Sequence, residues 1–445
     1  MEFFIQISQF LLSLSLLIIL HEFGHFIPAR LFKTKVEKFF LFFDVKFALF
    51  QKKIGETVYG IGWLPLGGYV KIAGMIDESM DKEQMAQPAQ PWEFRSKPAW
   101  QRLIIMLGGV IVNFIIALVI YIFAAFFYGE TDIQTSSIKG GLAINNEVLK
   151  NLGLENGDKI IAVDGKTYEN FSDISKNLIV SEEITVDRNG ETMNFKIPED
   201  FLGQLSDGER AALFTIRQPF IVGAVSDSSA NKTKDLNQGD VLLKINGEAI
   251  PYFDQFPSKL ESLKNQNIEV TLLRDGKEMT QQLSVDEKGK LGIYPGYDPK
   301  MMQELGYLKI NSIEYGFFES FGVGTNKFVE QFAWYGKQLK KIFTPSSGAY
   351  KGVGGFIAIF SIFPDVWSWE AFWGITAFLS IMLGVLNLLP IPALDGGHVM
   401  FLLWEMITGK KPGDKFMEYA QMVGFFLLIA LVLLANGNDI LRLFK

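Results

Sequence analysis

Long apolar runs divide the chain into membrane-like and water-soluble parts. Four runs, at about 4–29, 102–128, 371–391 and 416–435, each hold roughly the 20 apolar residues that a helix needs to cross a bilayer. Between the second and third runs lie about 240 polar residues with mixed helix and strand periodicity. The pattern predicts a polytopic α-helical membrane protein with four transmembrane helices and one large extramembrane insert.

The loop after the first run is predicted to contain strands. Residues 56–72 alternate in polarity and are punctuated by glycine, as strands joined by tight turns are. We therefore expect a membrane-associated β-hairpin or sheet region at 45–75. Its open edge is suited to pairing with an extended peptide. A hairpin that only packs on the helices explains the same pattern equally well.

The large insert contains an internal repeat. The segment 157–165, G-D-K-I-I-A-V-D-G, returns at 239–247 as G-D-V-L-L-K-I-N-G. Each copy is followed by a hairpin signal, Asn189-Gly190 or Asp275-Gly276. The repeat resembles PDZ domains and predicts two tandem, extracytoplasmic α+β domains. Such grooves either bind a peptide as an added strand or, when blocked, act as a steric filter.

These features divide the chain into five expected parts. A stretch rich in Phe and Lys follows the repeats, and it is suited either to lie on the membrane surface or to pack on the PDZ-like domains. The expected parts are a first membrane domain at 1–132, PDZ-like domains at 133–215 and 216–297, an amphipathic segment at 298–350, and a second membrane domain at 351–445.

Charge sets the expected orientation and excludes one class of partner. Basic residues crowd the loop after the first run, and Lys410, Lys411 and Lys415 follow the third run. By the positive-inside rule both loops are cytoplasmic, so the insert lies outside. A net charge of −7 without a basic cluster excludes a nucleic-acid partner. The absence of cysteine excludes thiolate zinc ligands and cysteine nucleophiles.

The first candidate site lies at the end of the first run. His21-Glu22-Phe23-Gly24-His25 is an H-E-x-x-H motif in a chain with only three histidines. On a helix, positions i and i+4 share a face, so His21 and His25 can bind one metal ion while Glu22 stands beside it as a base. Charged groups at membrane depth are costly and are usually functional.

A carboxylate at the end of the third run completes the predicted site. Pro390 and Pro392 cannot donate backbone hydrogen bonds, so the helix must loosen before Asp395. The first and third runs cross the membrane in the same direction, and their carboxyl ends therefore face the same side. We expect Asp395 to join both histidines in one metal site near the cytoplasmic face. Two histidines, one carboxylate and an open position are typical of catalytic zinc.

Two further polar residues have less direct roles. His398 follows Asp395 by three residues, and we expect it to orient that carboxylate or to cap a helix. Asn113 lies beside small glycines in the second run. It is interpreted either as a helix-packing residue or as a member of the catalytic site.

These motifs together resemble the site-2 protease family of intramembrane zinc metalloproteases, most closely its bacterial regulator-of-sigma-E protease group. The resemblance rests on H-E-F-G-H at 21–25, N-x-x-P-x-P-x-L-D-G-G at 387–397, the four runs and the PDZ-like pair. It covers nearly the whole chain. The segment 354–359 is also similar to a family stretch, although Phe356 replaces its proline.

The resemblance implies specific roles. His21, His25 and Asp395 would bind one Zn²⁺ per chain, with Glu22 as the catalytic base. Residues expected to contact substrate are Asn387, Pro390, Pro392, Gly67, Gly68 and Tyr69. The implied substrates are single-span membrane proteins, such as anti-sigma factors or remnant signal peptides, already trimmed by another protease. The implied location is the bacterial inner membrane, with lipid as a further partner.

Two other functions are compatible with parts of the pattern. A membrane scaffold would use the PDZ-like pair to bind protein tails beside an inert metal site, but an inert site has no need of Glu22. A metal transporter would pass ions through the same ligands. It would require a path of intramembrane acidic or histidine residues, which the sequence lacks.

Overall fold

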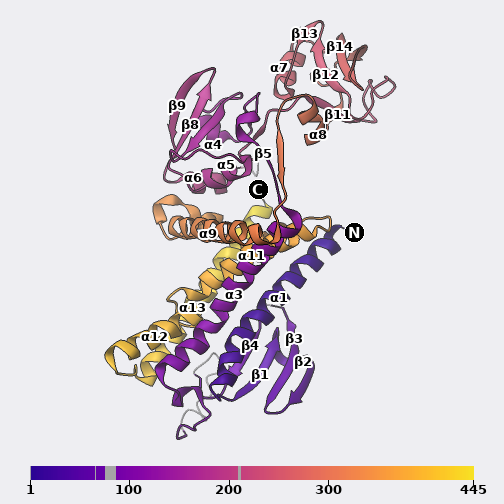
Figure 1. The fold of residues 1–445 in the computed structure, drawn as a ribbon. Coiled ribbons are helices and arrows are strands. Elements are labelled where there is room, and N and C mark those ends of the chain that lie inside the picture. The colour runs from indigo at the N-terminus through magenta and orange to yellow at the C-terminus, as the bar shows by residue number, and fades with distance from the viewer. Residues whose placement is uncertain (1, 66, 76–86, 209–211, 445) are drawn as a thin grey trace. The chain divides into compact units, whose positions relative to one another are not determined.

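The computed structural model describes residues 2–65, 67–75, 87–208 and 212–444. The chain forms two compact units (Figure 1). Unit 1 contains Met1–Gly129, Glu314–Gly336 and Val353–Lys445. Unit 2 contains Glu130–Ile313 and Lys337–Gly352. The predicted polar insert thus forms most of the second unit.

Unit 1 is built on long apolar helices. Among the described residues, four helices are long and apolar enough to cross a membrane, as the four hydrophobic runs predicted. The helices of this unit are α1 (Glu2–Leu31), α3 (Ala99–Tyr128), α10 (Phe356–Ser361), α11 (Trp369–Leu388), α12 (Asp395–Thr408) and α13 (Asp414–Leu443). An ion pair between Arg102 and Glu405 ties α3 to α12.

A four-stranded sheet packs beside the carboxyl end of α1 (Figure 1). It contains β1 (Val36–Leu41), β2 (Phe43–Ile54), β3 (Thr57–Leu64) and β4 (Tyr69–Ile72), in the order β2-β3-β1-β4. The alternation over 56–72 predicted strands, and β3 and β4 confirm this prediction. The sheet begins at Val36, earlier than the β region expected at 45–75. Val36 and Ile72 share a buried cluster with Ala29 of α1 and Ile105 of α3. This packing fixes the sheet against the helices.

The third apolar helix ends just before Pro390, as the two prolines in this segment predicted. Helix α11 stops at Leu388 and α12 begins at Asp395, so residues 389–394 form an irregular turn. Side chains at Gly396 and Gly397 would collide with backbone atoms of Leu389 and Ile391. These two glycines therefore allow α12 to fold back closely on the end of α11.

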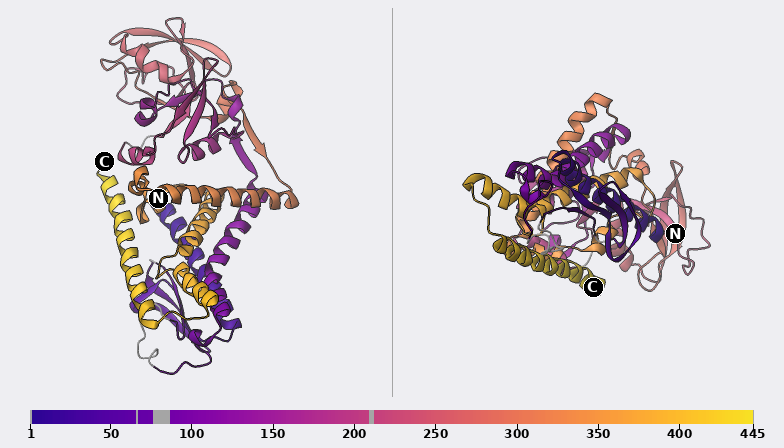
Figure 2. Two further views of the ribbon diagram at one scale, coloured as in Figure 1. Left: turned by 90° about the vertical axis from the view of Figure 1, so that its left-hand side faces the viewer. Right: turned by 90° about the horizontal axis from the view of Figure 1, so that it is seen from below.

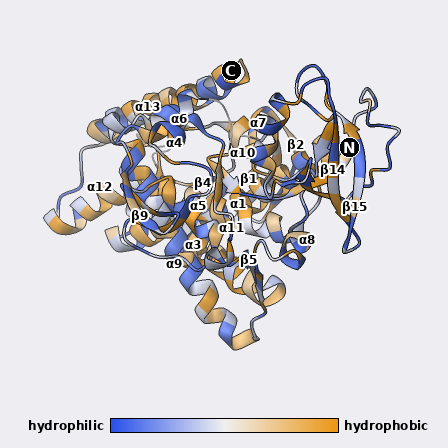
Figure 3. Cartoon of the chain, turned by 90° about the horizontal axis from the view of Figure 1, so that it is seen from above, coloured by the Kyte–Doolittle hydropathy of each residue, from blue (hydrophilic) through white to orange (hydrophobic). Residues whose placement is uncertain are grey.

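Helix α13 is the most exposed of the four candidate spans. Only 11% of its apolar window is buried inside the protein, compared with 44% for α3. Figure 2 shows it standing apart from the other candidate spans over most of its length, and its middle is apolar (Figure 3). Near its carboxyl end Asp439 accepts hydrogen bonds from the backbone nitrogens of Gly355 (3.0 Å) and Ala358 (3.1 Å). This end of α13 is thereby fixed to the start of α10.

The predicted amphipathic segment contains the 26-residue helix α9 (Phe317–Ile342). Within unit 1, Phe328 and Phe332 of α9 pack on Phe114 of α3, and Tyr335 packs on Phe378 of α11. The aromatic face of α9 therefore packs on two candidate spans, while Phe318 at its start is 86% exposed.

The internal repeat recurs as structure in unit 2. In each copy, the strand from the repeated motif pairs antiparallel with the first strand of a hairpin. In the first copy β7 (Lys159–Val163) pairs with β8 (Glu183–Arg188), which forms a hairpin with β9 (Glu191–Lys196). In the second copy β12 (Val241–Ile245) pairs with β14 (Asn267–Arg274), which forms a hairpin with β15 (Lys277–Ser284). The hairpin turns at Asn189-Gly190 and Asp275-Gly276 have positive φ at both positions, as the favoured two-residue turns require. Each copy has its own buried cluster, one within residues 142–214 and one within 220–291.

A buried ion pair also repeats in the two copies. Asp158 and Asp240 are each 1% exposed, and each accepts two hydrogen bonds from an arginine, Arg188 or Arg274. The strands and helices of unit 2 are β5 (Glu130–Ile133), β6 (Leu142–Ile144), α4 (Glu147–Asn151), β7 (Lys159–Val163), α5 (Phe171–Leu178), β8 (Glu183–Arg188), β9 (Glu191–Lys196), α6 (Phe201–Asp207), β10 (Phe214–Ile216), β11 (Phe220–Val225), β12 (Val241–Ile245), β13 (Glu248–Ala249), α7 (Phe256–Glu261), β14 (Asn267–Arg274), β15 (Lys277–Ser284), β16 (Ile293–Pro295), α8 (Pro299–Glu304) and β17 (Ile310–Ile313).

Candidate metal centre

The two histidines of H-E-x-x-H lie one turn apart on the buried face of α1. His21 is 8% exposed and His25 is 7% exposed. Helix α3 packs directly on this face because Gly24 of α1 meets Gly108 of α3, where either glycine would collide with backbone if it carried a side chain. A side chain at Gly109 would collide with both imidazoles. Small residues therefore let α3 form one wall of the site.

Asp395 lies opposite the histidines, as the topology argument predicted. Its Oδ2 atom is 3.4 Å from Nε2 of His21 and 3.3 Å from Nε2 of His25. The two Nε2 atoms are 3.3 Å apart. The first and third candidate spans thus bring together three residues that can each offer one atom to a metal ion.

The three ligand atoms fit a zinc ion. Tetrahedral zinc with bonds of about 2.0–2.1 Å places neighbouring ligand atoms roughly 3.3 Å apart, which matches the three separations. Asp395 Oδ2 is also buried without a hydrogen-bond partner among the described residues. A buried carboxylate oxygen without a partner is costly, and a bound cation would satisfy it.

The outer ring nitrogens of both histidines have partners that orient them. His25 Nδ1 lies 2.8 Å from the carbonyl oxygen of Ile105, so Nδ1 donates and Nε2 is left free for a metal. His21 Nδ1 lies 3.0 Å from the side-chain amide of Asn113. A metal on Nε2 puts the proton on Nδ1, so Asn113 must present its amide oxygen. That orientation also satisfies the Asn113 Oδ1 atom, which otherwise has no partner among the described residues.

A cavity of about 420 Å³ opens onto the cluster. It is bordered by residues of α1, α3, β4, α12 and α13. The lining residues are His21, Glu22, His25, Gly68, Tyr69, Val70, Ile72, Met75, Met106, Ala393, Leu394, Asp395, His398, Gln421, Met422, Phe425 and Phe426. Glu22 therefore shares a cavity with the three possible ligands, and most of the other lining side chains are apolar.

The sequence matches peptidase family M50 over residues 9–431. The chain belongs to peptidase family M50. Three relatives align along nearly their whole length. A Vibrio cholerae protein named as a zinc metalloprotease is 29% identical, with 98% of each chain covered. The regulator of sigma E protease of Haemophilus influenzae and regulator of sigma-E protease RseP of Escherichia coli are each 27% identical, with 100% of each chain covered.

Membership of M50 establishes the enzyme class. The chain is a zinc metalloprotease, and the cluster of His21, His25 and Asp395 is where its structure offers ligands for the metal. The family resemblance inferred from the sequence motifs is thereby confirmed.

The residues expected to contact substrate lie at different distances from the M50 cluster. Asn387 is near it, with its amide nitrogen 3.3 Å from His21 Nε2. Gly68 and Tyr69 line the cavity, whereas Gly67 packs beside the ring of Phe43. Pro390 and Pro392 lie in the irregular turn between α11 and α12. The last turn of α11 thus places Asn387 at the cluster, and the prolines follow directly where the helix ends.

Tyr69 is held by the sheet. Its hydroxyl donates to Asp44 Oδ1 (2.8 Å), and Lys38 donates to Asp44 Oδ2 (3.0 Å). Partial burial opposes ionisation of Asp44, but these hydrogen bonds outweigh it and hold the pKa of its carboxyl below the usual value. The carboxylate therefore keeps Tyr69 oriented at the cavity wall.

Helix α13 contributes residues that the sequence pattern did not indicate. Gln421, Met422, Phe425 and Phe426 line the cavity, and the amide nitrogen of Gln421 is 3.0 Å from Nε2 of His398. His398 also lines the cavity but is not part of the three-residue cluster. In the sequence, Gln421 is a polar residue within an apolar run, and this is the signal that could have indicated that α13 lines the cavity.

The absence of a side chain at Gly109 is predicted to be essential for metal binding. We expect Gly109→Ala to weaken zinc binding roughly tenfold or more, because the added carbon displaces both imidazoles. Zinc content of the purified protein measures this. Gly374→Ala is a matched control on α11, where an added carbon meets nothing within 4 Å. Equal zinc content in the two variants would contradict the tight α1–α3 contact.

Proposed function

We propose that this metalloprotease cleaves a peptide bond within the transmembrane segment of single-span membrane proteins. The observation that carries the proposal is the position of the cluster. Its two histidines lie inside α1, a candidate membrane span, and its carboxylate follows α11, another such span. Hydrolytic residues placed there would meet a substrate segment that also spans the bilayer. Positive charge near the same ends of these helices supports a site toward the cytoplasmic face.

Each residue has a distinct part in the proposed reaction. A zinc ion held by His21, His25 and Asp395 would lower the pKa of its bound water and polarise the scissile carbonyl. Glu22 takes the proton from the attacking water and passes it to the leaving amine nitrogen. Asn113 and the Ile105 carbonyl hold the imidazoles in the orientation that leaves Nε2 free. The apolar lining of the cavity limits the entry of bulk water.

An extended substrate is proposed to pair with β4. This strand is at the edge of the four-stranded sheet, and Tyr69, Val70 and Ile72 line the cavity beside Glu22. A transmembrane helix hides its carbonyl groups in its own hydrogen bonds, so it must unwind before hydrolysis. Pairing with an open strand edge replaces the lost backbone hydrogen bonds. Asn387 then lies where it can contact the extended chain near His21.

A proline on β4 tests the pairing. We expect Val70→Pro to reduce cleavage at least roughly tenfold while zinc content stays at the wild-type level, because proline removes the backbone N–H of Val70, which faces Glu22 at the cavity, and leaves the three metal ligands in place. Lys52→Pro is a control on β2, the opposite edge of the same sheet. Unchanged cleavage by the Val70→Pro variant would rule out strand pairing at this edge.

The repeated domains of unit 2 are proposed to be extracytoplasmic PDZ-like domains that admit only shortened substrates. The support is the internal repeat and its insertion between candidate spans α3 and α11. In this role the two domains select substrates by size. Anti-sigma factors and remnant signal peptides fit this description.

One experiment tests the function as a whole. The purified protease in lipid nanodiscs is given a tagged single-span protein in two forms, one with a short outer tail and one with a folded outer domain. We expect cleavage of the short form only, at a bond inside the span located by mass spectrometry. A chelator should abolish cleavage and added Zn²⁺ should restore it. Cleavage mapped outside the span would contradict intramembrane proteolysis, and equal cleavage of both forms would contradict the size filter.

A further inference from the structure

A second cavity lies at the carboxyl end of α1, separate from the metal centre. It has a volume of about 430 Å³ and is lined by Arg30, Lys33, Thr34, Lys35, Glu56 and Trp92. None of these residues lines the metal cavity. The cavity follows directly on a candidate membrane span, at the corner where α1 leads into β1.

The cavity has an excess of positive charge. Glu56 pairs with Arg30 at 3.6 Å, and both side chains are largely exposed, so this pair is weak. No carboxylate of the described residues lies within ion-pair distance of Lys33 or Lys35. Lys97 adds a further cation nearby, since its amine donates to the backbone oxygen of Lys33. Two lysines thus face the cavity with nothing to neutralise them among the described residues.

A buried hydroxyl among the lining residues also lacks a partner. Thr34 is 1% exposed, and its Oγ1 makes no hydrogen bond with any described residue. Its backbone nitrogen is already used, because it donates to the carbonyl of Ala29 at 2.8 Å. A buried hydroxyl without a partner is unfavourable unless something outside the chain satisfies it. Hydroxyl and ammonium donors together are the groups that bind a phosphate.

The surroundings of the cavity are those of a membrane interface. Leu31, the last residue of α1, is 73% exposed, and two tryptophans near it, Trp92 and Trp100, are each about half exposed at 47% and 49%. Trp100 packs edge-on against Phe32. Tryptophan is enriched where the hydrocarbon core meets the headgroups, and basic residues next to a span attract anionic lipid.

We propose that this cavity binds the phosphate of an anionic phospholipid headgroup. The lysines neutralise the phosphate, Thr34 donates its hydroxyl to a phosphate oxygen, and Trp92 lies at the level of the headgroups. A lipid bound there would hold the turn between α1, which carries two of the metal ligands, and β1, the neighbour of the β4 edge strand. The proposal depends on α1 spanning a membrane and not on peptidase activity.

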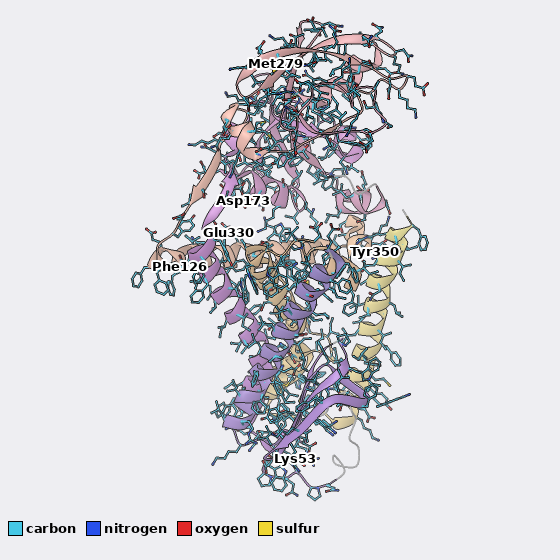
Figure 4. The ribbon with its side chains drawn as sticks, turned by 90° about the vertical axis from the view of Figure 1, so that its right-hand side faces the viewer. Lys53, Phe126, Asp173, Met279, Glu330 and Tyr350 are labelled. Atoms are coloured by element: carbon cyan, nitrogen blue, oxygen red, sulfur yellow. The ribbon has the colours of Figure 1, made fainter. Side chains whose placement is uncertain are left out.

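Lipid retention and thermal unfolding of the full-length protein test the proposal. In nanodiscs we expect phosphatidylglycerol, compared with phosphatidylcholine, to raise the unfolding midpoint of the wild type and to remain bound in native mass spectra. Lys33→Gln/Lys35→Gln should weaken retention roughly fivefold for each charge removed. Lys52→Gln/Lys53→Gln is the matched control on β2, where both lysines are exposed and Lys53 is labelled in Figure 4. An equal loss of lipid retention in both double variants would mean that general surface charge causes the effect, and would overturn the proposed site.

Thr34→Val separates a ligand contact from a structural role. Without anionic lipid this variant should unfold at the wild-type midpoint or above, because it removes a hydroxyl that has no partner. With phosphatidylglycerol, the unfolding midpoint of this variant should rise less than that of the wild type. An equal rise would overturn the proposed contact between Thr34 and the phosphate.

Inorganic phosphate added to the protein in a phosphatidylcholine nanodisc tests the source of the phosphate. A full shift of the unfolding midpoint with inorganic phosphate alone would overturn the assignment to a lipid. Loss of substrate affinity in the lysine variant with normal lipid retention would assign the cavity to an acidic substrate tail.

Discussion

Replacing Glu22 by glutamine is expected to abolish cleavage while leaving zinc in place. Glutamine has the shape of glutamate but cannot take a proton from the attacking water, and the loss of a positioned base typically costs 10²–10⁴-fold in rate. The three ligand atoms belong to His21, His25 and Asp395, so the variant should keep the zinc content of the wild type. Single-turnover cleavage of a tagged single-span protein, with zinc measured on the same sample, checks both statements.

The control for this variant is the same change at a carboxylate far from the chemistry. Glu330 is exposed on α9 (Figure 4), and Glu330→Gln should cleave at the wild-type rate. If Glu22→Gln cleaves within about tenfold of the wild type, the proton acceptor is another group. The experiment therefore separates a role for Glu22 as the base from a role in holding the metal.

Replacing Asp395 by alanine is expected to remove zinc as well as activity. The variant loses one of three protein ligands, so affinity should fall by more than the 10–100-fold that follows the loss of an orienting partner. Two histidines one turn apart remain, and they are insufficient to hold zinc against a moderate chelator. Metal content after dialysis, followed by cleavage with excess Zn²⁺, distinguishes weak binding from misfolding.

Asp439→Ala provides a matched comparison in the same unit. Asp439 is also a buried carboxylate, at 2% exposure, but it caps the start of α10 instead of facing the metal cluster. We expect this variant to be less stable and to keep its zinc. Zinc at the wild-type level in Asp395→Ala would show that the carboxylate is not a ligand.

Several parts of the fold were predictable because the physical constraint behind them is local. A span needs about 20 apolar residues in sequence, so the four candidate helices follow directly from composition. The break before Asp395 follows from the prolines, and the hairpins from Asn-Gly and Asp-Gly. His21, His25 and Asp395 were predicted to lie together because the first and third spans cross the membrane in the same direction, which puts their carboxyl ends on the same side.

Other parts depend on contacts that no local pattern encodes. The order β2-β3-β1-β4 places a parallel pair, β1 with β3, inside a short segment that was expected to hold hairpins, and the choice depends on packing against α1 and α3. Asn113 was interpreted chiefly as a packing residue, yet its amide faces His21. The contribution of α13 to the cavity was not predicted, because its apolar sequence is equally typical of a helix that faces only lipid.

The glycine contact between α1 and α3 divides the metal centre into a fixed half and an adjustable half. Backbone meets backbone at Gly24 and Gly108, so the imidazoles and their wall cannot separate without breaking a packed interface. The opposite wall, α13, is mostly uncovered along its apolar window. Any widening that admits a substrate should therefore occur on the α13 side. The metal geometry can then stay constant while the entrance to the cavity changes shape.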